Sequence, residues 1–286
     1  MSAARTREEI ASAFISACRA ELQALKPGNV HVFAPGHGMN IHHFERAAAA
    51  AAPWIAEPSL KVGARILRAT DASFGVTGLN TNLGIVLLSA PLAKAAAEVD
   101  VGTGLRRRLA DILSMLDEDD ANNAFEAIRL VNPAGLGNVE KGDVSLPNPR
   151  LTLIEAMHLA KDRDRIANAY VTAFEDIFDF ALPAFTEARA LTECFSLAVS
   201  TLHMGLLAAF EDSHIARKHG IAAARSVQER ALELQHHWRP VVTPKSFEHL
   251  RDFDTKLKEI GLNPGTTADF VVATIFCGLM SGRKQA

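Results

Sequence analysis

Apolar residues recur along most of the chain at the three- and four-residue spacing that is typical of amphipathic helices. The first such run covers residues 6–25, where Ile10, Phe14, Cys18 and Leu22 mark the apolar positions. No series of segments alternates apolar and polar residues as strands do, and no repeat of about 20–50 residues recurs. The pattern therefore predicts an all-α protein with a single multi-helix domain over residues 1–286.

One segment is apolar enough to form the centre of that domain. Residues 194–210 contain no Asp, Glu, Lys or Arg, and Glu193 and Glu211 flank them. The segment is shorter than the roughly 20 residues that span a membrane, so we expect a buried core helix. Further helices are predicted for residues 43–55, 61–72, 84–97, 103–116, 120–130, 152–180, 185–210, 221–237 and 267–280, with a short helix that ends near residue 260.

Polar, glycine-bearing loops separate the predicted helices, and such loops often carry function on a rigid scaffold. Residues 26–29, Lys-Pro-Gly-Asn, suit a type II turn with glycine at its third position. Residues 263–266, Asn-Pro-Gly-Thr, predict a second Pro-Gly turn. Thr152 and Glu155 have the spacing of a capping box, so we expect a helix to begin there.

Composition and charge narrow the function classes. The net charge of −3 gives no global positive field for a nucleic-acid backbone, so bound phosphates would need a local basic cluster. Three widely spaced cysteines predict neither a disulfide framework nor a zinc site. The first residues lack the apolar region of a signal peptide, and a reducing, cytoplasmic location is expected. Small-molecule substrates are the expected partners, and a homodimer is one possible assembly.

The densest group of chemical side chains lies in residues 212–220, directly after the apolar core segment. Asp212 can hold Mg²⁺, and His214 can transfer a proton. Arg217 and Lys218 can bind phosphate oxygens. The same cations would also complement a helix C-terminus before Gly220, and the residues alone leave both interpretations open.

Three other segments offer further candidates, each with a structural alternative. Lys26 and His37 lie in the first loop and could bind phosphate or transfer a proton, or simply form a turn and a solvated side chain. Asn80 and its two successors could present backbone amides to an anion, or only cap the next helix. Asp269 stands early in the last predicted helix, where a metal ligand or a favourable charge at the helix start would fit.

Taken in order, four segments resemble the signatures of the triphosphoribosyl-dephospho-CoA synthase family over nearly the whole chain. The chain departs from those signatures at five positions. Leu25 replaces a proline, and Gly38 and Asn40 replace acids. Asn82 and Leu83 replace His and Lys, which resembles a divergent branch found in archaea and methylotrophic bacteria. The four segments are Lys26-Pro27-Gly28, residues 36–44, Gly78-Leu79-Asn80-Thr81-Asn82-Leu83-Gly84 and residues 263–269.

The resemblance implies an all-helical transferase that uses ATP. In the family reaction a ribose hydroxyl of dephospho-CoA attacks C1′ of ATP and adenine leaves, with charge development like that in glycoside hydrolysis. The acceptor here would be dephospho-CoA or a related precursor, with one-carbon cofactors of the methanopterin or methanofuran type included.

The candidate site residues come from the matched segments, from the polar group at residues 212–220 and, for Asp143, from the loop of residues 131–150. We expect the neighbourhoods of Lys26, Asn80, Asp212 and Asp269 to meet in one pocket. Two other functions remain open: a non-catalytic nucleotide-binding or scaffold protein, and a metal-dependent phosphohydrolase or ADP-ribosyl hydrolase. The expected catalytic residues are Asp212, His214 and His37; the nucleotide-binding residues are Lys26, Gly28, Asn80, Thr81, Asn82, Arg217 and Lys218; the Mg²⁺ ligands are Asp212, Asp269 and Asp143.

Overall fold

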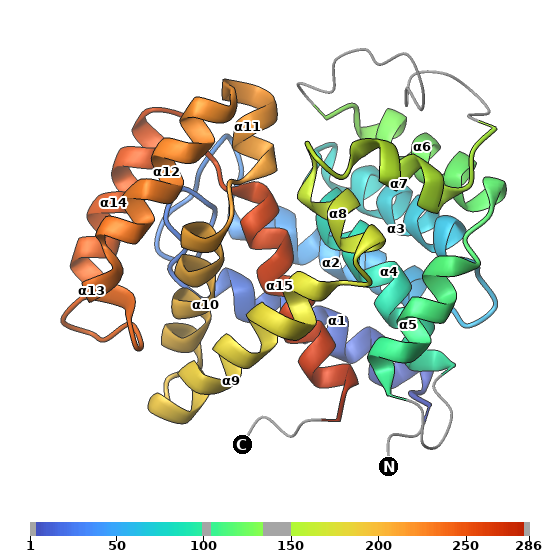
Figure 1. Ribbon diagram of the computed structural model, residues 1–286, viewed down its shortest axis with the longest axis horizontal. Helices are drawn as coiled ribbons and strands as arrows, with labels where there is room; N and C mark the ends of the chain where they lie inside the picture. The colour runs from blue at the N-terminus through green and yellow to red at the C-terminus, as the bar shows by residue number, and fades with distance from the viewer. Residues whose placement is uncertain (1–3, 99–103, 134–149, 283–286) are drawn as a thin grey trace. The chain divides into compact units, whose positions relative to one another are not determined.

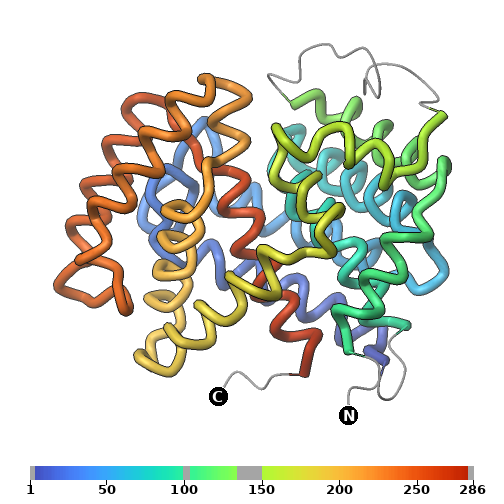
Figure 2. Tube along the Cα trace, viewed as in Figure 1, coloured from blue at the N-terminus to red at the C-terminus, as the bar shows by residue number. Residues whose placement is uncertain are grey.

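The computed structural model describes residues 4–98, 104–133 and 150–282, and in this part of the chain the regular elements are all helices joined by loops (Figure 1). Within these ranges no strand forms, and the only β-type pairing is two isolated bridges in the loop after the first helix. The predicted all-α fold is therefore confirmed. Figure 2 traces the chain through these helices.

Fifteen α-helices and one π-helix are found in the described residues. They are α1 (Arg7–Leu22), α2 (Ile41–Ile55), α3 (Val62–Thr77), α4 (Leu83–Ala97), α5 (Leu105–Ser114), α6 (Glu118–Val131), α7 (Leu153–Ala160), α8 (Arg165–Val171), the π-helix η1 (Asp176–Ala181), α9 (Leu182–Leu191), α10 (Phe195–Ala209), α11 (Ser213–His219), α12 (Ile221–Glu233), α13 (Gln235–Trp238), α14 (Phe247–Glu259) and α15 (Gly265–Met280).

The helices belong to two compact units. The first unit comprises Met1–Ser16, His43–Asp176 and Phe276–Ala286, and the second comprises Ala17–His42 and Ile177–Ile275. Helices α1 and α15 therefore contribute residues to both units. This division describes compactness alone, and the single domain over residues 1–286 stays a prediction.

The first unit is built around the packing of α3 against α6 and α4. Gly63 lies against the backbone of Asp120, where a side chain on Gly63 would collide with it. The Asp120 carboxylate accepts a hydrogen bond from the Gly63 amide at 2.7 Å and also closes the capping box at the start of α6. One buried acid therefore fixes the starts of two neighbouring helices.

The second unit has α10 at its core, as the apolar segment predicted. Val199, His203 and Met204 on this helix are completely buried. The surrounding apolar cluster includes Leu250 of α14, Trp238 of α13 and other side chains of α11 and α12. This core positions the loop after α1 and the starts of α11 and α15, which carry most of the candidate site.

Local signals predicted helix starts and turns better than helix lengths. Thr152 and Glu155 form the expected capping box at α7. The predicted helix over residues 152–180 is instead divided into α7, α8 and η1. The Asp164 side chain caps α8 by accepting from the Ile166 amide, so a new helix begins at Arg165. The predicted helix over residues 185–210 is likewise broken between α9 and α10.

The two predicted Pro-Gly turns have different outcomes. At residues 26–29 the Asn29 amide donates to the Lys26 carbonyl at 3.0 Å and Gly28 has a φ of +82°, which confirms a type II turn. The turn predicted for residues 263–266 is wrong, because Gly265 is already the first residue of α15. Cys18, Cys194 and Cys277 are free thiols. Among the described helices, none has the length and apolar character needed to cross a membrane.

Candidate functional site

Most of the expected site residues lie in the second unit. They occupy the loop of residues 23–40, the start and end of α11, and the first turns of α15. Asn80, Thr81 and Asn82 lie in the first unit, so their convergence with the others stays a prediction. Asp143 lies outside the described residues.

Lys26 is completely buried inside the turn that it begins. Its ammonium group donates to the Glu21 carboxylate, to Asn29 Oδ1 at 2.9 Å and to the Val30 carbonyl at 2.7 Å. Burial lowers the pKa of Lys26 and raises the pKa of Glu21. A lysine has three N–H donors, and all three are engaged here. The arrangement favours a structural role for Lys26 over the expected phosphate contact.

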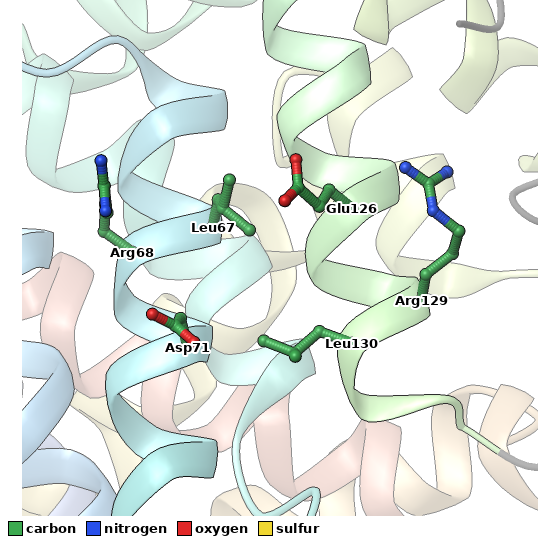
Figure 3. A pocket seen from close by; sticks show the side chains of 6 residues that line it. All are labelled: Leu67, Arg68, Asp71, Glu126, Arg129 and Leu130. Carbon is green, nitrogen blue, oxygen red and sulfur yellow. The ribbon is translucent and has the colours of Figure 1, made fainter. Parts of the chain in front are cut away.

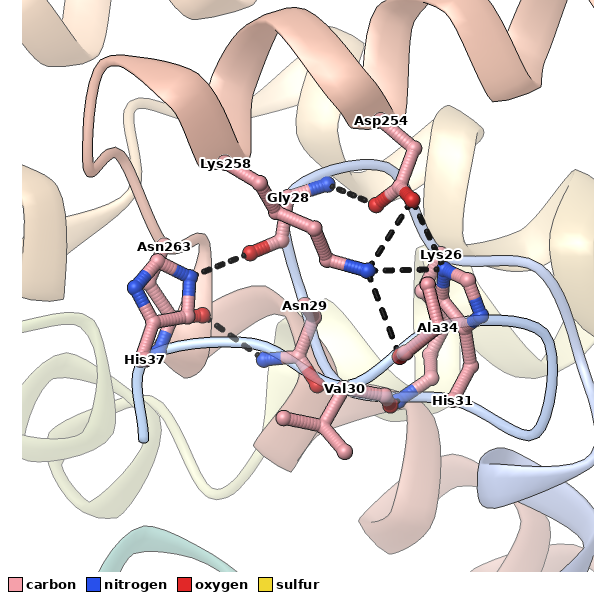
Figure 4. A network of polar contacts seen from close by, with 10 residues as sticks. All are labelled: Lys26, Gly28, Asn29, Val30, His31, Ala34, His37, Asp254, Lys258 and Asn263. Carbon is pink, nitrogen blue, oxygen red and sulfur yellow. Dashed lines mark hydrogen bonds and ion pairs between the residues drawn. The ribbon is translucent and has the colours of Figure 1, made fainter. Parts of the chain in front are cut away.

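Gly28 is fixed by its backbone on both sides (Figure 4). Its amide donates to Asp254 Oδ1 at 2.9 Å, and its carbonyl lies 2.8 Å from Nε2 of His37. A Cβ at this position would lie 2.7 Å from Cδ of Pro264, so only glycine allows the turn to approach the start of α15 this closely. Gly28 therefore allows the first loop to pack against Pro264, directly before the last helix.

Two residues of α14 that no sequence motif singled out, Asp254 and Lys258, belong to the same network. Asp254 Oδ2 lies 3.2 Å from Nε2 of His31 and 2.9 Å from the Lys258 ammonium (Figure 4). Lys258 also donates to the Ala34 carbonyl at 3.4 Å. The spacing of four residues between Asp254 and Lys258 suits a helical ion pair, but nothing local indicates that the pair is buried.

Asp212 holds the starts of two helices together. Its Oδ1 accepts from the Ile215 amide at 3.0 Å and so caps α11. Its Oδ2 accepts from the Thr267 amide at 2.7 Å and the Thr267 hydroxyl at 2.8 Å. The side chain is buried, and burial raises its pKa while these hydrogen bonds act in the opposite direction. The structure thus gives Asp212 a positioning role, and its catalytic and metal-binding roles stay predictions.

His214 points toward the first residue of α15. A Cβ on Gly265 would lie 2.8 Å from Nδ1 of His214, so this glycine makes room for the imidazole. Nε2 is buried and has no hydrogen-bond partner within the described part of the chain. Burial, followed by the charges of Lys218 and Arg217 and the nearby His37, lowers the pKa of His214 to about 3. The ring is therefore neutral at pH 7.

Cations gather around this histidine at the end of α11. Arg217 is half-buried, whereas Lys218 and His219 are exposed. Partial burial and the charge of Arg217 lower the pKa of Lys218. His37 is exposed and acts electrostatically on His214, so it belongs to the same neighbourhood. Adjacent positive charges favour the binding of an anion, and the phosphate-binding role of Arg217 and Lys218 stays a prediction.

Asp269 lies two residues after Thr267, the partner of Asp212, so the neighbourhoods of the two acids meet within the second unit. Asp269 also raises the pKa of Cys18, after burial and Glu21, which places its carboxylate toward the end of α1. In the ranges that the structure describes, no group of three or more His, Cys, Asp or Glu side chains has a metal-binding arrangement. Since Asp143 lies outside these ranges, the expected Mg²⁺ ligand set stays a prediction.

The loop of residues 78–82 in the first unit contains the three remaining candidates, Asn80, Thr81 and Asn82. Asn80 Oδ1 accepts from the Leu83 amide at 3.4 Å, at the start of α4. Asn82 is buried and donates to the Ser73 hydroxyl at 3.0 Å. The buried Thr81 hydroxyl has no hydrogen-bond partner among the described residues. Capping explains Asn80, as expected, and the nucleotide-binding role of Thr81 stays a prediction.

A separate groove lies between α3 and α6 of the first unit (Figure 3). It has a volume of about 400 Å³ and carries both acidic and basic side chains, so it has no single electrostatic preference. None of its residues was expected in the site. The lining residues are Leu67, Arg68, Asp71, Glu126, Arg129 and Leu130.

Comparison with known proteins identifies one family. Residues 7–286 match the model of the CitG family, described as ATP:dephospho-CoA triphosphoribosyl transferase. The structure is similar to that of an Archaeoglobus fulgidus protein with the provisional name triphosphoribosyl-dephospho-CoA synthase, at a TM-score of 0.63 and 25% identity. That match covers 82% of this chain and 98% of the other. No curated protein sequence matches the chain.

Proposed function

The chain belongs to the ATP:dephospho-CoA triphosphoribosyl transferase family, and from this we propose that it joins the triphosphoribosyl unit of ATP to an acceptor hydroxyl and releases adenine. The observation that carries the proposal is the cation cluster around His214, at the junction of α11 and α15. Such a cluster suits a polyphosphate, which is the part of ATP that the transfer retains.

The reaction breaks one bond and forms one bond at the same carbon. The acceptor oxygen bonds to C1′ of the ATP ribose, and the bond from C1′ to the adenine nitrogen breaks with its electron pair on adenine. Positive charge develops on the ribose in between. The acceptor hydroxyl must lose a proton and adenine must gain one, so groups that transfer protons are needed on both sides.

The triphosphate is proposed to bind Arg217 and Lys218, with His37 nearby. Lys26 and Asp212 are engaged inside the protein and would hold the surrounding loops in place. Burial is the main reason for the low pKa of His214, and the charges of Lys218 and Arg217 add to it, so a bound triphosphate would offset only the second contribution.

The remaining roles are finer parts of the same proposal. Asn80, Thr81 and Asn82 stay candidate nucleotide-binding residues, and the Thr81 hydroxyl has no hydrogen-bond partner among the described residues. Mg²⁺ would accompany the triphosphate, with Asp269 as the candidate ligand that the structure leaves half-buried. The acceptor would be dephospho-CoA or a related precursor, in which we include precursors of one-carbon cofactors.

The test is to incubate the protein with ATP and Mg²⁺ and with dephospho-CoA or alternative acceptors, and to follow products by mass spectrometry. Adenine together with an acceptor that has gained a triphosphoribosyl unit would support the proposal. ATP binding without any product would favour the scaffold alternative. Phosphate release without adenine would favour a phosphohydrolase and contradict the proposed transfer.

A further inference from the structure

The face of α14 that meets the loop after α1 carries an ion pair with an unusual number of loop contacts (Figure 4). Asp254 accepts from the Gly28 amide through one carboxylate oxygen and contacts His31 through the other. Lys258, one helical turn later, bonds to that second oxygen at 2.9 Å and to the Ala34 carbonyl at 3.4 Å. Two side chains of one helix thus hold three points of the loop.

The environment of Asp254 distinguishes this pair from a surface salt bridge. Asp254 is only 4% exposed. Burial by itself would raise the pKa of Asp254, but its contacts with His31 and Lys258 outweigh burial, so its pKa lies below the usual range. The carboxylate is therefore charged inside the protein, where losing a partner costs far more than it does at the surface.

Contacts of Gly28 and its neighbour Asn29 determine where parts of the candidate site lie. The Gly28 carbonyl lies 2.8 Å from Nε2 of His37, and the next residue, Asn29, donates to Asn263 Oδ1 at 2.8 Å. Asn263 stands just before α15, whose first residue packs against His214. A shift of Gly28 would therefore move His37 and the entry to α15 together.

We propose that Asp254 is a positioning residue for the transfer reaction and that it acts through Gly28, with Lys258 as its partner. The inference rests on the proposed function because its consequence is the placement of His37 beside His214. Neither Asp254 nor Lys258 has to touch the substrate. Loss of the Asp254 contact should therefore lower kcat, since misplacing a reacting group by about 1 Å can cost on the order of 100-fold in rate.

The main variant is Asp254→Asn, which keeps the size and the acceptor for Gly28 but removes the charge that faces Lys258 and His31. Its matched control is Asp252→Asn on the same helix, because Asp252 is exposed and makes none of these contacts. We expect kcat for adenine release to fall about 10–100-fold in Asp254→Asn. The KM for ATP should stay within about twofold, because Arg217 and Lys218 are unchanged, and the control should match the wild type.

Hydrogen exchange of the loop amides, measured without substrate, tests whether Asp254 holds the loop after α1 in place. Faster exchange over residues 28–39 is expected in Asp254→Asn and not in Asp252→Asn. A merely stabilising ion pair would lower the melting temperature without this local change and without a selective fall in kcat. If Asp254→Asn does not fold, Lys258→Gln tests the same contacts from a partly exposed position, and a fall in kcat in the same direction is expected.

The results separate the inference from the proposed function. A wild-type protein that releases no adenine with any acceptor contradicts the proposed function, and the role of Asp254 in that reaction falls with it. A wild-type protein that does release adenine, beside an Asp254→Asn or Lys258→Gln variant with unchanged kcat, contradicts the inference alone. Unchanged loop exchange in Asp254→Asn also overturns it.

Discussion

The second unit contains two polar clusters that are built on opposite principles. In the buried network around the first loop, cations face carboxylates: Lys26 meets Glu21, and Lys258 meets Asp254. At the end of α11, Arg217 and Lys218 lie close together and both lower the pKa of the neutral His214. The carboxylates of the first cluster offset its cations, whereas the two adjacent cations at the end of α11 form a local positive field that favours an anion.

The contrast indicates that the two clusters have different roles. The paired network should determine whether the loop has its native shape, so changes there should affect stability and kcat. The cation cluster should determine whether a polyphosphate binds, so changes there should affect KM and its salt dependence with little loss of stability. Each prediction below tests one of these two roles.

The largest effect is expected from Lys26→Met in the buried network. Glu21 would then be a buried carboxylate without its cation, which costs about 3–5 kcal/mol of the free energy of unfolding. Urea denaturation of the variant and the wild type measures this difference. The double variant Glu21→Gln with Lys26→Met should recover much of the loss. A loss below about 1 kcal/mol in the single variant would mean that Lys26 is not held as a buried ion pair.

Asp212→Ala should cost somewhat less, about 2–4 kcal/mol, because two helix starts lose their cap and buried donors lose their acceptor. The exposed Asp252→Ala is the matched control, with an expected change within about 0.5 kcal/mol. Both are measured by urea denaturation. If Asp212→Ala keeps wild-type stability but loses adenine release, Asp212 acts in catalysis or metal binding and not chiefly as a cap.

Acid should weaken the fold through His203 on α10. Burial, reinforced by Lys26, lowers the pKa of His203 to about 3, whereas in the unfolded chain it has its ordinary value of 6.5. As the pH falls below 6.5 the unfolded chain gains a proton that the folded chain does not, so stability present above pH 6.5 is lost. Between pH 7 and pH 5 this loss is about 2 kcal/mol.

The variant His203→Gln isolates that contribution, because glutamine does not titrate. Urea denaturation at pH 7 and at pH 5 should show a smaller difference in the variant than in the wild type, whatever the variant costs at pH 7. His214, whose pKa is also about 3, should leave a remaining slope in the variant. An unchanged pH dependence would show that His203 titrates normally in the folded protein.

The smallest free-energy change is expected in the cation cluster. Arg217→Ala should raise the KM for ATP about tenfold, because one charge-assisted contact to phosphate is lost. Arg225→Ala on α12 is a suitable control, since this exposed arginine pairs with Glu211. Steady-state kinetics at two salt concentrations measure both variants. A large loss of stability in Arg217→Ala, with an unchanged KM, would place Arg217 among the structural charges.

Local signals in the sequence predicted much of the fold. The uncharged segment of residues 194–210 became the core helix, Pro27 and Gly28 formed the expected turn, and Thr152 began a helix. The turn expected at Pro264 failed because the same Pro-Gly pair can also begin a helix, and packing against Gly28 decides between them. Local chemistry therefore fixes the available conformations, and distant contacts select one.

The candidate site was less predictable for the same reason. An acid one turn before an Arg-Lys pair has the same local pattern whether it binds a metal or caps a helix. The Thr267 contact that gives Asp212 its positioning role comes from 55 residues further along the chain. Gly28 and Asp254 are 226 residues apart, so no spacing rule connects them. Arg217 and Lys218 are neighbours in the sequence, so their proximity needed no structure, whereas their role in phosphate binding stays a prediction.

The most direct test of the proposed transfer uses ATP with ¹³C in the ribose and unlabelled adenine, together with dephospho-CoA. Mass spectrometry then follows the label and the released base. The account predicts that the acceptor gains the labelled ribose with all three phosphates, and that free unlabelled adenine appears in equal amount. Label that remains joined to adenine, as ADP, AMP or adenosine, would contradict the account.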